Sequence, residues 1–284
     1  MNLPDEALMF RPMQNTPLLT DRKALLTNRA RADRSKGLFL QEAAADDIQD
    51  RLEMVNRPFT KPAIVTAFPE IWQNRIPNAT IVPDSDTLEL SANSHDLVIH
   101  SMCLHWANDP VGQLIQCRHA LVSDGLLMTA SFGGQTLHEL RASLGQAESE
   151  TRGGMAPRVL PMGEIRDMGA LLQRAGMALP VADSLPLTVS YETPWHLMRD
   201  LRAMGEANAL TARLRRFSGR QVFQRAAQLY AQTYQSDERV SATFELIFMT
   251  AWCPDENQPK PLRPGSAAAR LADALGTKET KLAD

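Results

Sequence analysis

The chain has 284 residues, of which 44% are hydrophobic and 22% are charged; this composition is typical of a folded globular protein and excludes a disordered or fibrous one. Its length suits one α/β domain with insertions. A formal net charge of −3 and a pI near 6.1 give no broad cationic surface, which argues against nucleic acid as a partner.

The location of the protein is predicted from what the sequence lacks. No stretch approaches the ~20 apolar residues of a membrane span, and the first ten residues, MNLPDEALMF, contain early acids and a proline. Cys103, Cys117 and Cys253 are widely spaced and form no metal-ligand pattern, so reduced thiols are expected. We predict a cytoplasmic protein without a membrane span or a metal site. These patterns do not indicate an oligomeric state.

The first part of the chain is predicted to be an N-terminal extension, residues 1–34, followed by a helix. Ser35–Val55 carries apolar residues at helical spacing, which predicts an amphipathic helix on a core. A basic run precedes and enters this helix and is interpreted as solvated surface, with an acidic protein partner as the alternative. Its members are Arg22, Lys23, Arg29, Arg31, Arg34 and Lys36.

Three short apolar runs predict the first strands. They are Pro62–Phe68, followed by a short helix over Glu70–Asn74, then Ala79–Val82 and Asp96–His100. In the last of these, consecutive apolar residues indicate a sheet that is covered on both faces. We therefore predict an α/β fold with a doubly wound, mostly parallel sheet.

From Val111 onward the chain continues the alternation of helices and strands. Helical spacing over Val111–Val122 stops at Ser123–Gly125, and a strand follows at Leu126–Ser131. The later elements are helices at Leu137–Ala147 and Ile165–Ala175, a strand at Leu185–Tyr191, helices at Leu197–Met204 and Val222–Tyr230, and a strand at Thr243–Trp252. These predict a domain over 35–255 with a helical insertion at about 194–236. Residues 256–284 are predicted to be a mobile C-terminal tail with at most a short helix at Ala267–Leu275.

In a doubly wound sheet, ligands bind beyond the carboxyl ends of the strands. The loops after Phe68, Val82, His100 and Ser131 should therefore share one crevice. This places a set of candidate binding residues near one another, namely Asp84, Ser85, Leu104, His105 and Trp106.

Several strings from residue 104 onward carry a family resemblance. They are LHWANDP at 104–110, FGGQTLHELR at 132–141, MGEANAL at 204–210 and ATFELIFMTAW at 242–252. Over residues 40–255 the chain resembles the methyltransferase-like family that includes the mitochondrial complex I assembly factor 5 and its bacterial relatives, which are similar to malonyl-carrier-protein methyltransferases. The resemblance implies the Class I methyltransferase, or Rossmann-like, fold and S-adenosylmethionine (SAM) as the cofactor.

The resemblance also implies roles for residues in the crevice. Asp84 matches the acid near the adenine, and the Leu104–Trp106 segment matches the wall beside the methionine part of the cofactor, where an indole can face the sulfonium. On the substrate side, the loop after the strand at Leu126–Ser131 and the helix behind it supply candidates, with a turn, a helix cap and a surface ion pair as the alternatives. These candidates are Gly133, Gly134, Thr136 and Arg141.

The chain departs from the family upstream of these strings. No glycine occurs from Leu38 through Val111, although family members have a Gly-rich turn after the first strand and an acid after the second. PAIVTAFPEIW, residues 62–72, occupies that place, so one βα unit is predicted to be shortened, with the loss of two cofactor contacts. Glu70 could replace the missing acid, or it could be an ordinary residue of a helix N-terminus.

Three hypotheses about function follow. The first is a SAM-dependent methyltransferase acting on an unidentified acceptor, with no catalytic residue assigned. The second is a non-catalytic assembly or interaction protein that has lost SAM binding and recognises a protein partner. The third, by family analogy, is the hydroxylation of a protein arginine. A crevice filled by Phe68 and Trp72 would favour the second.

Overall fold

The computed structural model describes residues 18–259 and 276–277. The chain divides into two compact units, Met1–Pro254 and Asp255–Asp284, and the described helices and strands all lie in the first. The short helix predicted at 267–275 lies outside the described residues.

Seven α-helices and two short 3-10 helices form within the described residues. The α-helices are α1 (Arg22–Ala30), α2 (Phe39–Val55), α3 (Pro110–Ala120), α4 (His138–Arg152), α5 (Ile165–Arg174), α6 (Pro194–Ala203) and α7 (Arg220–Tyr234); the 3-10 helices are η1 (Pro69–Ile71) and η2 (Leu104–Trp106). Polar side chains cap several N-termini: Asp21 accepts from the Ala24 amide at 3.1 Å and Asp109 from the Gly112 amide at 2.8 Å. Pro110 and Pro194 occupy first turns, where no amide donor is needed.

Seven strands form one mixed sheet. They are β1 (Pro62–Thr66), β2 (Thr80–Val82), β3 (His95–Ser101), β4 (Leu121–Phe132), β5 (Ala178–Tyr191), β6 (Gln235–Ser236) and β7 (Arg239–Trp252). Their order is β2-β1-β3-β4-β7-β5, with β6 paired to β7. The first four strands in this order are parallel, and β7 runs antiparallel to β4 and to β5. The predicted doubly wound class is confirmed.

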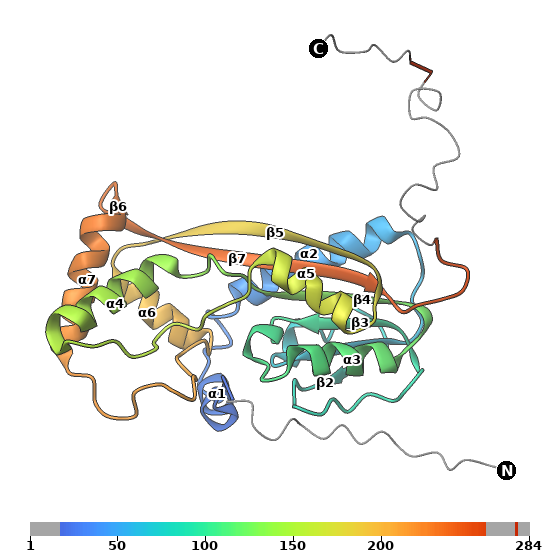
Figure 1. Ribbon diagram of the computed structural model, residues 1–284, viewed down its shortest axis with the longest axis horizontal. Helices are drawn as coiled ribbons and strands as arrows, with labels where there is room; N and C mark the ends of the chain where they lie inside the picture. Colours follow the sequence, from blue (N-terminus) through green and yellow to red (C-terminus); the bar gives the residue numbers. More distant parts are fainter. Residues whose placement is uncertain (1–17, 260–275, 278–284) are drawn as a thin grey trace, which may run out of the picture. The chain divides into compact units, whose positions relative to one another are not determined.

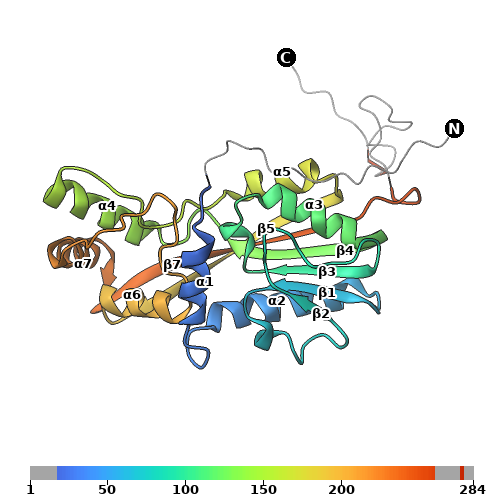
Figure 2. The ribbon, with the colours of Figure 1, turned by 90° about the horizontal axis from the view of Figure 1, so that it is seen from below.

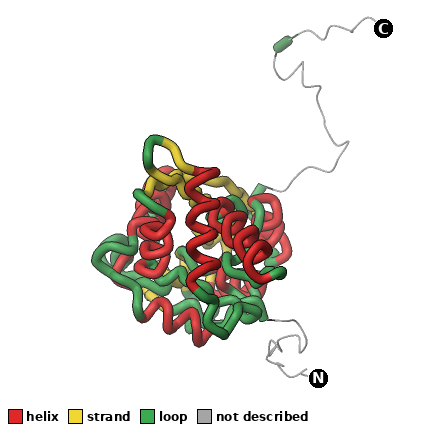
Figure 3. Tube along the Cα trace, turned by 90° about the vertical axis from the view of Figure 1, so that its left-hand side faces the viewer, coloured by secondary structure: helices red, strands yellow, loops and turns green. Residues whose placement is uncertain are grey.

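Helices cover both faces of the sheet. In Figure 2, α3 and α5 lie on one side of the strands and α2 on the other, while α4, α6 and α7 gather at the far end of β5 and β7 (Figure 1). Successive strand residues alternate between the two cores: Ile64 packs into the core with α2, whereas Ala63 and Val65 pack into the core with α3 and α5. Seen from the end that carries α4 and α7, helices flank the strands (Figure 3).

Two strands begin earlier in the chain than predicted. The helical pattern was expected to run to Val122, but β4 starts at Leu121, and Ser123–Gly125 is an irregularity inside the strand, where Asp124 has a φ of 56°. β5 starts at Ala178 rather than at Leu185. Pro180 hides the start of this strand in the sequence, and both Pro180 and Pro186 are tolerated because β5 is an edge strand.

The first half of the fold is shortened, as predicted. β1 and β2 are adjacent parallel strands, and η1 is the sole helix between them. The predicted helical insertion before the last strand is also present, as α6 and α7. The contraction leaves the carboxyl end of β1 next to the core beneath α2.

Candidate functional site

The segment after β1 is packed into the core. Phe68 and Trp72 have no solvent exposure and belong to the same core cluster as Leu40 and Ile48 of α2. The backbone turns into η1 at Pro69, so large side chains occupy the place where the resemblance led us to expect a Gly-rich turn. Glu70 pairs with Arg34, which means that its carboxylate is engaged within the protein.

Asp84, directly after β2, lies in a buried ion cluster. Arg29 of α1 donates from Nη1 to both carboxylate oxygens, at 2.8 and 2.9 Å, and Arg22 donates from Nη1 to Oδ2 at 3.1 Å. Asp84 is 2% exposed and Arg29 is 4% exposed. Burial alone would raise the pKa of Asp84, but the two guanidinium groups hold it below its ordinary value. Asp84 is therefore an ionised, fully engaged carboxylate.

The basic run was interpreted as solvated surface, and for two of its members this was wrong. Arg22 and Arg29 lie seven positions apart, which places them on the same side of α1, and both side chains turn inward to Asp84. Burial would lower the pKa of Arg29, but the charges of Asp84 and Glu206 raise it above its ordinary value. A buried arginine needs a buried acid, and the sequence alone did not link α1 with the end of β2.

The segment before α1 is tied to the chain that follows α6. Residues 20 and 210 form an antiparallel bridge, and the Asp21 amide donates to the Ala209 carbonyl at 2.8 Å. Arg213 adds an ion pair to Asp21 at 2.9 Å. α1 is thus held in place over the carboxyl end of β2 by main-chain and side-chain bonds.

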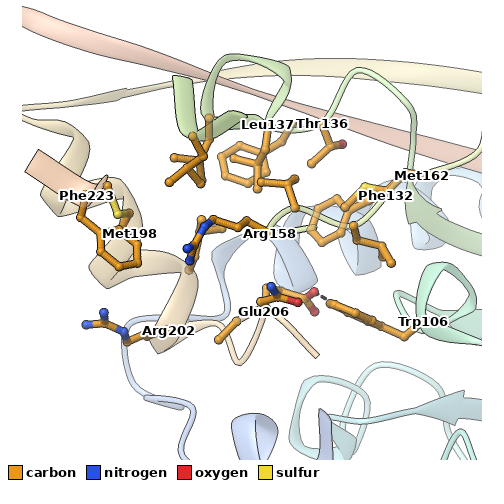
Figure 4. A pocket seen from close by; sticks show the side chains of 18 residues that line it. Trp106, Phe132, Thr136, Leu137, Arg158, Met162, Met198, Arg202, Glu206 and Phe223 are labelled. Atoms are coloured by element: carbon orange, nitrogen blue, oxygen red, sulfur yellow. Dashed lines mark hydrogen bonds between the residues drawn. The ribbon is translucent and has the colours of Figure 1, made fainter. Parts of the chain in front are cut away.

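Glu206 forms a second buried acidic centre. Gly205, with a φ of 80°, ends α6, and the Glu206 amide closes the turn by donating to the Leu201 carbonyl at 2.9 Å. The Glu206 carboxylate accepts from the Trp106 indole at 2.6 Å and lies 3.5 Å from Nε2 of His105. Burial would raise its pKa, but His105, Arg29 and Trp106 lower it below the ordinary value. Figure 4 shows the Glu206 carboxylate directed at Trp106.

A cavity of about 260 Å³ opens beside Trp106 and Glu206, and both residues line it. Apolar side chains from the loop after β4 and from α4, α6 and α7 form most of its wall, together with Arg158 and Arg202 (Figure 4). Arg158 forms an ion pair with Glu148. Burial would raise the pKa of Glu148, but the pairing with Arg158 lowers it below the ordinary value. Such a mostly apolar pocket with a few polar groups is typical of a site for an organic ligand.

The structure separates the five predicted cofactor residues into two groups. Asp84 and Ser85 lie after β2, where the Ser85 carbonyl accepts from Gln113 at 3.1 Å. Leu104, His105 and Trp106 form η2, with Leu104 in the core of α3 and α5 and the other two at Glu206. The roles assigned to them in binding SAM stay predictions.

The predicted substrate residues cluster around the start of α4. Thr136 lines the cavity and exchanges hydrogen bonds with the main chain of Glu245, at 3.0 and 3.2 Å. A Cβ at Gly133 would lie 2.5 Å from the Glu245 carboxylate and one at Gly134 would lie still closer to the Glu164 carboxylate, so these side chains would have to shift. Arg141 donates to the Thr136 and Leu160 carbonyls, both at 3.3 Å, and so supports the cavity wall. Their roles toward a substrate also stay predictions.

Sequence reasoning missed the main polar partners of these residues. The bond from Trp106 to Glu206 joins residues 100 positions apart, and no local pattern reveals such a pair. Arg158 was not singled out. Within the described residues, no group of three or more His, Cys, Asp or Glu could hold a metal ion. Cys103, Cys117 and Cys253 form no disulfide with one another.

The adenosine part of SAM does not fit the residues present at the carboxyl ends of β1 and β2. In this fold class the cofactor lies across those strand ends. Here Phe68 and Trp72 fill the turn after β1, and both oxygens of Asp84 already accept from Arg29. The indole NH of Trp106 is likewise taken by Glu206. A nucleoside would have to displace α1 to reach Asp84.

A sheet with this strand order is that of the Class I methyltransferase fold. No family model matches the chain. It is 36% identical over 222 residues to a protein of Danio rerio named arginine-hydroxylase NDUFAF5, mitochondrial, covering 78% of this chain and 69% of that one. The chain therefore belongs to the family of NDUFAF5. It spans 42 to 69% of the length of the NDUFAF5 relatives that it matches.

Two further similarities concern methyltransferases. The chain is 36% identical over 187 residues to a malonyl-[acyl-carrier protein] O-methyltransferase of Laribacter hongkongensis, covering 66% of this chain and 61% of that one. A solved phosphoethanolamine N-methyltransferase of Haemonchus contortus, in complex with S-adenosylhomocysteine, is 13% identical with a TM-score of 0.42, covering 80% of this chain and 60% of that one. Nothing about the chemistry of this chain follows from the second likeness.

None of the helices in residues 18–259 is both long and apolar enough to cross a membrane. The NDUFAF5 relatives are named as mitochondrial proteins, and the cytoplasmic location of this chain stays a prediction.

Proposed function

We propose that this chain is a non-catalytic member of its methyltransferase-like family, which keeps the scaffold and acts by binding an assembly or interaction partner. The observation that carries the proposal is the buried cluster of Arg22, Arg29 and Asp84 at the carboxyl end of β2. The turn after β1 supports the same proposal, because it is filled by Phe68 and Trp72, as this hypothesis requires.

The physical reason is that opening this site is costly. A ligand at Asp84 must replace the charge-assisted hydrogen bonds from Arg29. The Arg29 guanidinium would then be a buried charge without its carboxylate partner. The bonds that tie residues 20 and 21 to residues 209 and 210 would also have to give way, because they hold α1 in place. The scaffold is thereby closed at the place where methyl transfer would need its cofactor.

A SAM-dependent methyltransferase acting on an unidentified acceptor is the second candidate function. It is favoured by the similarity to proteins named malonyl-[acyl-carrier protein] O-methyltransferase and by the cavity next to Trp106. In this candidate the residues after β3 and β4 would line the acceptor side of the site. Hydroxylation of a protein arginine, the activity in the names of the NDUFAF5 relatives, is the third candidate and rests on family analogy.

Calorimetric titration of the purified full chain with SAM separates the first two candidates. We expect no heat of binding up to millimolar SAM, because Arg29 and Asp84 satisfy each other and Trp72 fills the turn. An active Class I methyltransferase, titrated in the same buffer, controls for the quality of the ligand. Micromolar affinity for SAM that is weakened by Trp106→Ala would refute the non-catalytic proposal and establish the second candidate.

A further inference from the structure

The loop between α6 and α7 has an unusual composition that the proposed function does not use. Residues 213–220 read RLRRFSGR, with four arginines around one phenylalanine. Phe217 is 84% exposed. A single exposed apolar residue is ordinary on a protein surface, so Phe217 has significance only together with its neighbours.

A second loop lies beside this one. Arg152, at the end of α4, donates to the Phe217 carbonyl at 3.4 Å and to the Ser218 carbonyl, and Arg158 donates to the Ser218 hydroxyl at 2.9 Å. These bonds join the loop after α4 to the loop before α7, at the left of Figure 1. Met155, in the loop after α4, is 76% exposed. The large apolar side chains of Met155 and Phe217 are thus exposed to solvent on two loops that are hydrogen-bonded to each other.

Positive charge is in excess around Phe217. Asp21 pairs with Arg213 at 2.9 Å and with Arg215 at 3.4 Å. Among the residues that the structure describes, no carboxylate pairs with Arg152, Arg216 or Arg220, and all three are exposed. A chain with a net charge of −3 therefore presents a local cationic surface with an apolar centre.

We propose that this surface, made of Arg152, Met155, Arg215, Arg216, Phe217 and Arg220, binds a segment of a partner protein that carries several carboxylates around an apolar side chain. The inference rests on the proposed function and names the chemistry of its partner. The two loops contain arginine and no lysine over 151–158 and 211–220. A guanidinium holds a carboxylate through two parallel bonds, and Arg, Phe and Met are enriched in protein interfaces whereas Lys is depleted. These properties favour a protein over an anionic membrane.

Photo-crosslinking in the host cells tests this surface in the full chain. A benzoylphenylalanine in place of Phe217 is expected to crosslink to a protein peptide rich in Asp and Glu, which mass spectrometry of the crosslinked peptide identifies. The same group in place of Val181, which is exposed on β5, should not capture that peptide. Adding Arg215→Glu and Arg216→Glu should lower the yield at least about tenfold, since charge pairs across an interface carry both affinity and association rate.

A matched control keeps the test specific to the site. Arg166→Glu with Arg174→Glu makes the same charge change on exposed residues of α5 and should leave the yield unchanged. Circular dichroism confirms that every variant is folded. Crosslinks to peptides without acidic residues would overturn the inference. An unchanged crosslinking yield after Arg215→Glu and Arg216→Glu would overturn it as well. So would crosslinks to lipid, accompanied by co-sedimentation with phosphatidylcholine vesicles that contain phosphatidylglycerol. The SAM titration probes a different part of the fold, so either proposal can fail alone.

Discussion

Replacing Asp84 by asparagine is expected to lower the free energy of unfolding by about 3 to 5 kcal/mol, because the substitution leaves Arg29 charged and buried without its acid. Urea unfolding of the full chain at pH 7, followed by circular dichroism, measures the loss. Asp50→Asn is the matched control, since Asp50 is an exposed aspartate on α2 whose change should cost less than about 0.5 kcal/mol. A loss below about 1 kcal/mol for Asp84→Asn would contradict the buried pair.

A double substitution tests whether the cost comes from the unpaired charge. Asp84→Leu combined with Arg29→Met removes both charges, and buried pairs replaced by apolar residues are often neutral in stability. We expect the double variant to be more stable than Asp84→Leu alone, which corresponds to a coupling energy between the two sites. Equal stabilities of the single and double variants would mean that the pair contributes little.

The pH dependence of this loss has a defined sign. The pKa of Asp84 is lowered in the folded protein, so its contribution to stability is complete above its ordinary pKa of 3.8 and is lost as the pH falls through the folded value. The stability difference between the native chain and Asp84→Asn should therefore stay constant from pH 7 to about pH 5 and shrink below about pH 4. A difference that grows on acidification would contradict the lowered pKa.

The sequence predicted the fold well because the relevant signals are local. Apolar runs such as Leu97–Ile99 and the helical spacing of Leu40, Ala44 and Ile48 depend on short-range geometry, and both segments lie in the cores where the pattern placed them. The missing glycines between Leu38 and Val111 correctly indicated the shortened first half. The strand boundaries at Leu121 and Ala178 were missed, because an irregularity interrupts the local pattern of β4 and Pro180 interrupts that of β5.

The candidate site was predicted less completely because its contacts are distant in the sequence. The pairs of Arg29 with Asp84 and of Trp106 with Glu206 join residues 55 and 100 positions apart. From the sequence alone, a charged residue on a helix is interpreted as solvated surface. Its buried partner is known only once the packing of the helix is known. Asp84 and Trp106 were found from their positions after strands, whereas the groups that close the crevice required the structure.

Trp72→Ala is expected to destabilise the chain by about 3 to 5 kcal/mol, since Trp72 is fully buried against α2 and its removal leaves a cavity that the backbone cannot fill. Thermal and urea unfolding measure the effect. Trp72→Phe should cost less, because it keeps most of the apolar contact and removes an indole NH that has no partner within the described residues. Trp195→Ala, at an exposed position on α6, is the control and should change stability little.

The same variant decides what the segment after β1 is for. If Phe68 and Trp72 are core, Trp72→Ala loses stability and gains no affinity for adenosine, because the buried pair of Arg29 and Asp84 still closes the neighbouring strand end. If the segment instead stands in for a ligand, Trp72→Ala would lose less than about 1 kcal/mol and would bind adenosine in the calorimeter. That outcome would mean that the strand ends of β1 and β2 can open to a ligand. Methyl transfer would then be the favoured function. A large loss of stability without binding would instead mean that the contraction between β1 and β2 replaced the cofactor turn with protein core.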